Sequence, residues 1–315
     1  MGEDYLYYKY SDFLKKHYHT KVYKLPVNLP VTCPNRSDGH GCTFCAEDGT
    51  GFEAMPSHVS VTEQLMRTQE YIRRRYKAQK FIAYFQNYTN TYLPLEHLAA
   101  YMKEAAVVPD IVEIAISTRP DCIREDYLDM MEAFSKKFGI CIAIELGLQT
   151  ANYHTLKDIR RGHGLAEYLD GALRIKRRNF LLCTHVILNL PGDNMEDVKE
   201  TSKILSVMGN DLVKIHSLYV AKGTEMARLY ENGQLDICSK EEYFLRLQNF
   251  LEYLSPEIAV ERLFSRIPEE DALFSNWQTS WWRLQEEFMA YMKIEKSFQG
   301  KKCGYMNGAA LKTII

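Results

Sequence analysis

Three cysteines stand close together near the start of the chain, in the segment TCPNRSDGHGCTFC at residues 32–45: Cys33, Cys42 and Cys45. Thiolates are soft ligands that select zinc, copper(I) or iron–sulfur clusters, so this spacing indicates a metal site. A structural zinc site closes with four ligands drawn from two paired knuckles, and the sequence offers no second cysteine pair at such spacing. In a four-iron cluster each iron needs a ligand of its own. Three cysteines therefore predict a cluster with one iron left open to hold a cofactor or substrate.

The other five cysteines are scattered singly, at Cys122, Cys141, Cys183, Cys238 and Cys303. Two of them lie inside the apolar runs GICIAIEL and FLLCTHVIL, where a lone cysteine behaves as a small buried hydrophobic residue. We predict that Cys122, Cys141, Cys183 and Cys238 are structural and bind no metal. The alternative for the three clustered cysteines is a small zinc site or a set of unrelated thiols.

The spacing C-x8-C-x2-C, with Phe44 just before the last cysteine, resembles the cluster loop of radical S-adenosylmethionine (SAM) enzymes, whose prototype is C-x3-C-x2-C. The longer first gap is similar to the branch containing the catalytic subunit of Elongator and, more closely, to the bacterial YhcC/YtqA-type proteins. Further strings that resemble this group extend to the C-terminus: KVYKLPV, YFQNYTNTY, STRPD, ELGLQT, RRGH, LPGD, VKIHSLYVAKGT and QGKK. The resemblance implies a [4Fe–4S] cluster on the three cysteines, with SAM on the open iron.

The elements that position these motifs follow a repeating order. Continuous apolar runs at residues 22–29, 80–87, 110–118, 139–149, 180–190 and 211–220 predict six strands, because strands buried on both faces of a parallel sheet lack polar alternation. Helical patterns separate them, and the first begins at the capping-box sequence Ser-Val-Thr-Glu from Ser60. The economical fold class is α/β, a partial (β/α)6 barrel of the radical SAM type with a mainly helical C-terminal extension.

The predicted organisation has three parts. Residues 1–20 form a short helical segment packed on the barrel, residues 21–233 form the radical SAM (β/α)6 core, and residues 234–315 form a C-terminal extension that closes one side of the barrel. In the extension we expect a turn and an amphipathic helix, a short strand at AVERLFSRIP, and a long helix from NWQTSWW onward. A chain of 315 residues can bury such a core as one domain.

Composition indicates where in the cell the protein works and which partners it has. With 46% hydrophobic and 25% charged residues, the chain has no apolar run long enough to cross a bilayer. It has no basic-then-apolar signal design at the start, and its cysteine usage favours a reducing compartment. We therefore expect a cytoplasmic protein without a membrane partner. The net charge of −2 gives no evidence for nucleic acid. Three local basic clusters do occur, at residues 72–77, 174–180 and 299–305; the first two are explained equally well as solvated helix ends.

Polar residues recur where the predicted strands end, the face that carries active sites in barrels. The resemblance implies cofactor contacts for seven of these residues and for Arg161. Gln86 and Asn87 would hold the methionyl amine through backbone carbonyls, Thr118 and Arg119 would meet ribose or carboxylate, and Glu145 would meet ribose or sulfonium. Arg161, in RRGH, would bind the methionyl carboxylate, because arginine binds carboxylates bidentately. The remaining two positions are Gln149 and Asn189.

Each position also has a structural alternative. Glu145 could pair with Arg119, Arg161 could be a surface cation, and LPGD could be a plain loop in which Gly192 adopts a positive φ. Relatives usually carry glycine at Asn189, so the adenine contact there is altered. His163 could contact substrate or phosphate, or could be a structural histidine.

The resemblance also implies the reaction. A reduced cluster cleaves SAM to a 5′-deoxyadenosyl radical, which abstracts hydrogen from the substrate; the electron comes from a donor such as flavodoxin or ferredoxin. We predict a transfer RNA (tRNA) substrate and remodelling of the C5 side chain of the wobble uridine, for example from carboxymethylaminomethyl to aminomethyl. Alternatives are a small metabolite or a protein substrate, or a non-catalytic iron–sulfur redox or sensor protein. Residues that could stack on a base or meet phosphates are Tyr88, Tyr92, His163, Tyr219, Lys222, Lys301 and Lys302.

Overall fold

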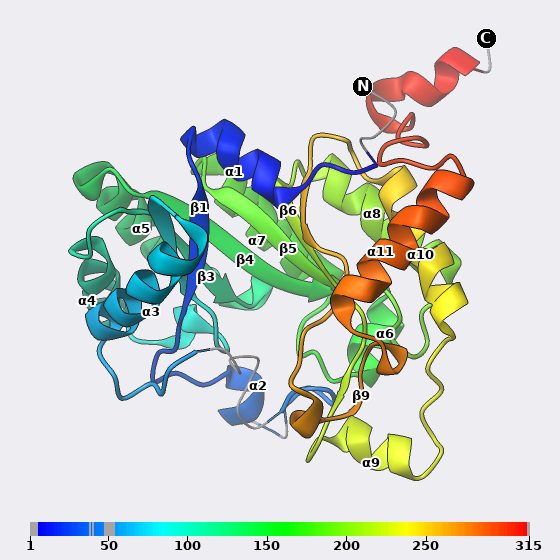
Figure 1. The fold of residues 1–315 in the computed structure, drawn as a ribbon, viewed down its shortest axis with the longest axis horizontal. Coiled ribbons are helices and arrows are strands. Elements are labelled where there is room, and N and C mark those ends of the chain that lie inside the picture. Colours follow the sequence, from blue (N-terminus) through cyan, green and yellow to red (C-terminus); the bar gives the residue numbers. More distant parts are fainter. Residues whose placement is uncertain (1–5, 38, 40, 47–53, 314–315) are drawn as a thin grey trace.

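A computed structural model describes residues 6–37, 39, 41–46 and 54–313. Seven strands form one wholly parallel sheet in the order β1-β2-β3-β4-β5-β6-β8, which curls into a half-barrel (Figure 1). A second, two-stranded antiparallel sheet pairs β7 with β9. The strands are β1 (Val22–Val27), β2 (Lys80–Phe85), β3 (Ile111–Thr118), β4 (Cys141–Gln149), β5 (Leu181–Ile187), β6 (Leu212–His216), β7 (Val220–Ala221), β8 (Ala259–Arg262) and β9 (Ala272–Phe274).

Helices connect successive strands and cover the outer face of the sheet (Figure 1). One apolar core lies between β1–β4 and the helices α3, α4, α5 and α7; a second lies between β5, β6, β8 and the helices α8, α10 and α11. The helices are α1 (Tyr10–Tyr18), α2 (Pro34–Ser37), α3 (Val61–Tyr76), α4 (Leu95–Ala106), α5 (Glu125–Phe138), α6 (Tyr153–Asp158), α7 (Leu165–Arg177), α8 (Met195–Val207), α9 (Glu225–Glu231), α10 (Lys240–Tyr253) and α11 (Trp281–Ile294). Short 3-10 turns lie at Asn90–Tyr92, Pro120–Cys122, Glu269–Asp271, Asn276–Gln278 and Met306–Thr313. Helix α3 starts as its sequence predicts, because the Ser60 side chain accepts the Glu63 amide.

Side chains alternate along each strand between the outer core and the inside of the curl. On β2, Phe81 and Phe85 join the outer core, whereas Tyr84 points inward to a separate cluster with residues of β1, β3 and β4. The inward positions of the other strands carry polar and charged groups, such as Glu145 on β4 and Lys214 on β6, which meet at 3.4 Å. The sequence pattern therefore builds an apolar shell around a polar interior.

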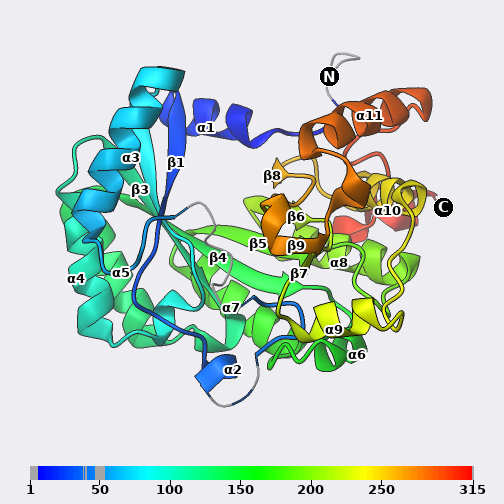
Figure 2. The ribbon, with the colours of Figure 1, turned by 60° about the horizontal axis from the view of Figure 1, so that its bottom comes forward.

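The N-terminal segment closes one end of this interior. Leu14 of α1 packs among the inward residues of β1–β4, while Tyr8 and Phe13 pack on those of β5, β6 and β8. The carbonyl of Tyr8 also accepts the amide of Val260 on β8. Helix α1 lies at the end of the molecule opposite α2, as both views show (Figures 1 and 2).

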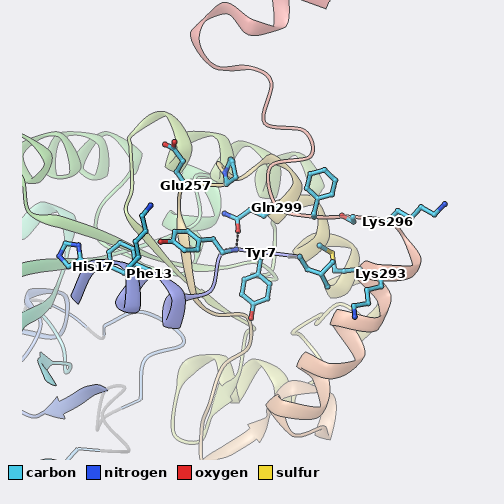
Figure 3. Close-up of a pocket in the computed structure, with 14 residues that line it drawn as sticks. Tyr7, Phe13, His17, Glu257, Lys293, Lys296 and Gln299 are labelled. Atoms are coloured by element: carbon cyan, nitrogen blue, oxygen red, sulfur yellow. Dashed lines mark hydrogen bonds between the residues drawn. The ribbon is translucent and has the colours of Figure 1, made fainter. Parts of the chain in front are cut away.

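The segment that follows α11 packs beside this N-terminal segment. Gln299 accepts the Tyr8 amide at 2.8 Å (Figure 3). Its side-chain amide donates to the carbonyls of Ser255 and Ile258. A groove of about 1400 Å³ runs here between the N-terminal segment and the end of α11. The late string QGKK thus anchors the N-terminal segment at the end of the molecule away from α2.

The predicted partial barrel is confirmed, with three differences in detail. The short strand expected at AVERLFSRIP joins the main sheet as β8 and makes a seventh strand. The run at residues 211–220 is divided, because Ser217 exchanges hydrogen bonds with Ser265 and the chain leaves the sheet to form β7. The helical region at residues 153–179 is interrupted at RRGH, where Gly162 has a φ of +78°. Within the described residues, no helix is long and apolar enough to cross a membrane.

Candidate active site

The cysteine loop follows β1 and lies at the end of the molecule that also carries α6 and α9 (Figures 1 and 2). The carbonyl of Cys33 accepts the amides of Arg36 and Ser37, and this starts the one-turn helix α2. Thr43 ties the rest of the loop to two other segments: its amide donates to the carbonyl of Ile159, and its carbonyl accepts the amide of Met226. The loop is therefore held in place by residues far away in the sequence.

Each of two cysteine sulfurs in the loop faces a buried arginine. Nη1 of Arg119 lies 3.7 Å from Sγ of Cys33, and Nη1 of Arg161 lies 3.6 Å from Sγ of Cys42. Nδ2 of Asn35 approaches Sγ of Cys42 as well, at 3.4 Å. All three loop thiols are free, and N–H groups aimed at sulfur stabilise the negative charge of thiolates and tune bound clusters. The donor set and its surroundings therefore fit a [4Fe–4S] cluster held by three cysteines.

The two arginines are fixed by the strand ends. Arg119, just after β3, makes a bidentate ion pair with Asp121, at 2.7 and 2.9 Å, and donates to the carbonyl of Gly162 at 3.0 Å. Arg161 donates through Nη2 to the carbonyl of Gly147 on β4 at 2.7 Å. It is only 7% exposed. The surface alternative for Arg161 is wrong, and Arg119 pairs with Asp121 rather than with Glu145.

Gly147 is the position at which RRGH meets β4. A Cβ atom there would lie 2.5 Å from Nη2 of Arg161 and 3.0 Å from Nε2 of Gln149, closer than such contacts allow. Gln149 has a φ of 79° at a register irregularity that ends the strand, as is common for bulges next to active sites. His163 also faces the carbonyl of Gly147, at 3.1 Å. Burial, more than the nearby Arg161, lowers the pKa of His163 to about 4, so its buried position disfavours the charged ring.

The turn after β2 presents buried acceptors. Asn90 donates from Nδ2 to three carbonyls, those of Phe85, Asn87 and Ser117, and so joins the ends of β2 and β3. Thr91 and Thr118 share a hydrogen bond at the same junction. The Oδ1 atoms of Asn87 and Asn90 are buried and accept no hydrogen bond from the described part of the chain. Such acceptors suit an ammonium group, so this turn fits the methionyl amine of SAM.

Inside the curl lies a cavity of about 780 Å³, within the usual range for small-molecule sites. Gln86, Tyr84, His185 and Lys214 form its inner wall, and lining residues between Ser265 and Trp281 form its outer wall. Tyr219 also lines it; burial and, after it, the nearby Cys45 raise the pKa of this phenol to about 12. The cavity thus extends from the polar interior of the barrel to Tyr219, whose phenol lies near Cys45.

Glu145 lies in the buried polar interior of the barrel. It is 2% exposed, and its carboxylate meets Lys24 at 2.6 Å, His185 at 2.7 Å and Lys214 at 3.4 Å. Asn189, where relatives usually carry glycine, accepts the amide of Leu218 through Oδ1 at 2.7 Å. This hydrogen bond joins the end of β5 to the segment after β6. Gly192, in LPGD, has the positive φ expected of it.

The residues suggested for substrate contact are spread over the molecule. Tyr219 faces the central cavity, while Lys222 lines a second groove of about 810 Å³ that also contains Cys42 and Cys45. Tyr88 lies beneath Arg36, and Tyr92 is 43% exposed. Lys301 and Lys302 do not join the site: both pair with the buried Glu252 beside the C-terminal end of α10.

Sequence reasoning missed the charged residues of the interior, Lys24, Lys214, Glu261 and Arg262. Lys24 bridges Glu145 and Glu261, at 2.6 and 2.7 Å. A signal was available, because a lysine stands in the middle of each of two otherwise apolar strands, VYKLPV and LVKIH. Charges are almost never buried singly, so each lysine implied an acidic partner inside the barrel.

Known proteins resemble this chain over most of its length. The family model for the radical SAM superfamily matches residues 27–205, and the model for the radical SAM C-terminal domain matches residues 210–293. Protein YhcC of Escherichia coli K12 is 32% identical over 92% of this chain and 93% of its own length. YtqA of Bacillus subtilis 168 is 31% identical over 94% of this chain and 92% of its own.

Two further similarities are to proteins of an archaeon, one in sequence and one in fold. The tRNA uridine(34) acetyltransferase of Methanocaldococcus infernus is 28% identical over 42% of this chain, and the match spans 24% of that protein. The solved structure of archaeal M. infernus Elp3, with an N-terminal deletion, superimposes with a TM-score of 0.68 at 18% identity and covers 89% of this chain and 64% of that one. The chain therefore belongs to the radical SAM superfamily, as its cysteine spacing predicts, and is an enzyme that uses a [4Fe–4S] cluster and SAM.

Proposed function

We propose that Cys33, Cys42 and Cys45 hold the cluster and that the strand-end residues hold SAM on its open iron. When bound, these cofactors supply a 5′-deoxyadenosyl radical, which is able to remove hydrogen from an unactivated carbon. The observation that carries the proposal is the contact of Arg119 and Arg161, from two separate motifs, with the sulfurs of Cys33 and Cys42. A cluster with a purely structural or sensing role has no need for a cavity beside it.

Different segments of the chain would contact different parts of SAM. The turn at Asn87 and Asn90 offers buried oxygen acceptors for the methionyl amine, and Gln86, which lines the cavity, can contact the same end of the cofactor. Arg161, 7% exposed and 3.6 Å from the Cys42 sulfur, is placed for the methionyl carboxylate or for the cluster itself. Gln149 and Thr118 complete the set of residues proposed to contact SAM. Together these residues orient the cofactor and exclude water from it.

We propose that the substrate is a wobble uridine of tRNA and that the enzyme remodels its C5 side chain, for example from carboxymethylaminomethyl to aminomethyl. Two similarities support this: the partial match to a tRNA uridine(34) acetyltransferase and the shared fold with Elp3. The central cavity has room for a splayed nucleotide, and Tyr219 and Trp281 on its wall offer rings for stacking. In the carboxymethylaminomethyl group, amine and carboxylate flank one methylene, so a radical there is stabilised. The reaction belongs in the cytoplasm, with an electron donor such as flavodoxin or ferredoxin.

Nucleoside mass spectrometry of tRNA from a strain that lacks this protein tests the proposal. We expect the carboxymethylaminomethyl form to accumulate and the remodelled form to disappear, and a plasmid copy of the wild-type gene to restore both. A plasmid copy with Cys42→Ala serves as the matched control and should not restore them. An unchanged set of wobble uridines would refute the tRNA proposal and would turn attention to a small metabolite or a protein, while the radical SAM assignment would stand.

A further inference from the structure

Four charged side chains inside the barrel, Lys24, Lys214, Glu145 and Glu261, form a balanced set. Glu113, a further buried carboxyl group, accepts from Tyr18, and burial raises its pKa to about 7. Two lysines and two glutamates alternate: Lys24 contacts Glu145 and Glu261, and Lys214 contacts the same two carboxylates at 3.4 and 3.1 Å. Two positive and two negative charges cancel, so neither carboxylate is free to neutralise a further cation. Any additional charge in this cavity must find its counterion elsewhere.

That additional charge is Arg262, the last residue of β8. The register slips between β6 and β8, so that Glu261 is an extra residue and Arg262, rather than Glu261, lies opposite Lys214. A bulge of this kind re-aims side chains, and it places both Glu261 and Arg262 on the inner side. Arg262 lines the central cavity. Across the described residues it forms no ion pair, and its buried Nε has no acceptor.

The neighbours of Arg262 do not supply the missing negative charge. Its Nη2 lies 2.6 Å from Nδ1 of His216. Burial, followed by the positive charge of Arg262, holds the pKa of His216 well below its usual range, so that ring is neutral. His185, 5.3 Å from His216 between ring centroids, already contacts Glu145. Glu269 is the only acidic residue among the described residues that line this cavity, and it is exposed on the outer wall.

The outer wall of the cavity carries a second arginine, Arg266. The guanidinium of Arg266 lies 3.8 Å from the centroid of the Trp281 ring, and both side chains line the outer wall of the cavity. An arginine stacked on an aromatic ring is a frequent platform for bases and a frequent contact for anions. The wall opposite the strand ends therefore presents an arginine stacked on an aromatic ring, and none of its residues belongs to the set that fits SAM.

We propose that Arg262 binds an anionic group of the substrate, a carboxylate or a phosphate, at the inner end of the central cavity. A planar guanidinium with an unused Nε offers the fork that binds either oxyanion. Its depth beside Lys214 favours a group carried on the reacting nucleoside over a backbone phosphate. In this form the proposal rests on the proposed function, since the carboxymethylaminomethyl side chain ends in such a carboxylate. Arg262 thereby sets specificity and positions the adjoining methylene.

The first experiment measures RNA binding by fluorescence anisotropy with the reconstituted holoenzyme. The probes are three anticodon stem-loops that differ only at the wobble uridine, which carries carboxymethylaminomethyl, aminomethyl or no group. We expect wild-type protein to bind the carboxylate-bearing RNA about tenfold more tightly than the other two, and Arg262→Met to bind all three alike. Arg283→Met, an exposed arginine of α11 outside the cavity, should behave as wild type. Equal weakening of all three RNAs by Arg262→Met would support the proposal with phosphate as the anion, whereas unchanged binding of all three would overturn it.

A second measurement separates this proposal from the tRNA hypothesis. If wild-type protein binds none of the RNAs, the tRNA hypothesis fails, and anion binding is then read from thermal unfolding in malonate, phosphate or chloride at equal ionic strength. We expect malonate or phosphate to raise the midpoint of wild type and of Arg283→Met by about 2–4 °C more than that of Arg262→Met. Equal midpoints in the three proteins would overturn the proposal. A loss of SAM affinity in Arg262→Met would also overturn it, because Arg262 would then serve the cofactor.

Discussion

Glu113 carries a carboxyl group that the fold keeps away from water, and its replacement by glutamine gives a quantitative test. The residue lies on β3, is 1% exposed, and accepts a hydrogen bond from the hydroxyl of Tyr18 on α1. Burial, the largest cause, raises its pKa from 4.5 to about 7 even though Tyr18 and Lys24 act in the opposite direction. Glutamine has the same shape without the charge and can still accept from Tyr18.

Proton linkage determines whether Glu113 makes the fold more or less stable as the pH rises. Between pH 4.5 and about 7 the folded protein holds a proton on Glu113 that the unfolded chain has released, so stability falls as the pH rises through this window. The penalty is about 1.4 kcal/mol at pH 5.5 and about 3.4 kcal/mol at pH 8.5, because each unit of pKa difference is worth about 1.4 kcal/mol. Glu113→Gln has no such penalty. Its stability relative to wild type should therefore improve by about 2 kcal/mol between these two pH values.

The free energy of unfolding is measured in urea, with circular dichroism as the probe, at about pH 5.5 and about pH 8.5. The difference between variant and wild type is then compared between the two pH values, so that effects independent of pH cancel. Glu132→Gln is the control. Hydrogen bonds from Lys136 and then from Arg178 lower the pKa of Glu132, so its replacement should bring no gain at high pH. A Glu113→Gln effect that changes by less than about 0.5 kcal/mol between the two pH values would refute the assignment of a buried, protonated Glu113.

Two further variants address the site itself. Gly147→Ala places a Cβ 2.5 Å from Nη2 of Arg161; we expect a loss of about tenfold or more in SAM affinity in equilibrium binding to the reconstituted protein, and an unchanged affinity would contradict the role given to RRGH. Glu145→Gln leaves Lys24 and Lys214 facing one remaining carboxylate, and should destabilise the fold by about 3 kcal/mol. Addition of Lys24→Met restores the charge balance and should recover part of that loss in urea unfolding; a double variant as unstable as the sum of the single variants would show that the four charges act independently.

The parts of the site that could be predicted from sequence are those determined by local chemistry. Three cysteines at short spacing indicated a cluster loop, and polar residues after apolar strands indicated the face on which they converge. Arg119 was found in this way and Arg161 through the string RRGH, and the structure brings both to the cysteine sulfurs. Strand ends are recognisable in a sequence because the change from apolar to polar residues occurs within two or three positions.

The parts that could not be predicted depend on contacts between distant segments. Lys24 and Glu261 are 237 residues apart in the sequence and 2.7 Å apart in space. The inward position of Arg262 depends on a register slip between β6 and β8, which neither strand reveals alone. Lys301 and Lys302 stand in a basic, aromatic string that suits RNA contact, yet both are used by Glu252, an acid whose burial the sequence does not disclose.

The most direct test of the central claim is SAM cleavage by anaerobically reconstituted protein, measured as 5′-deoxyadenosine per protein after reduction. Wild type should bind about four irons and form 5′-deoxyadenosine, whereas alanine at any one of Cys33, Cys42 and Cys45 should abolish both. The matched control replaces the four cysteines predicted to be structural, Cys122, Cys141, Cys183 and Cys238, and should retain cluster and cleavage in the folded protein. Full iron content and 5′-deoxyadenosine formation in the triple variant of the loop cysteines would contradict the account.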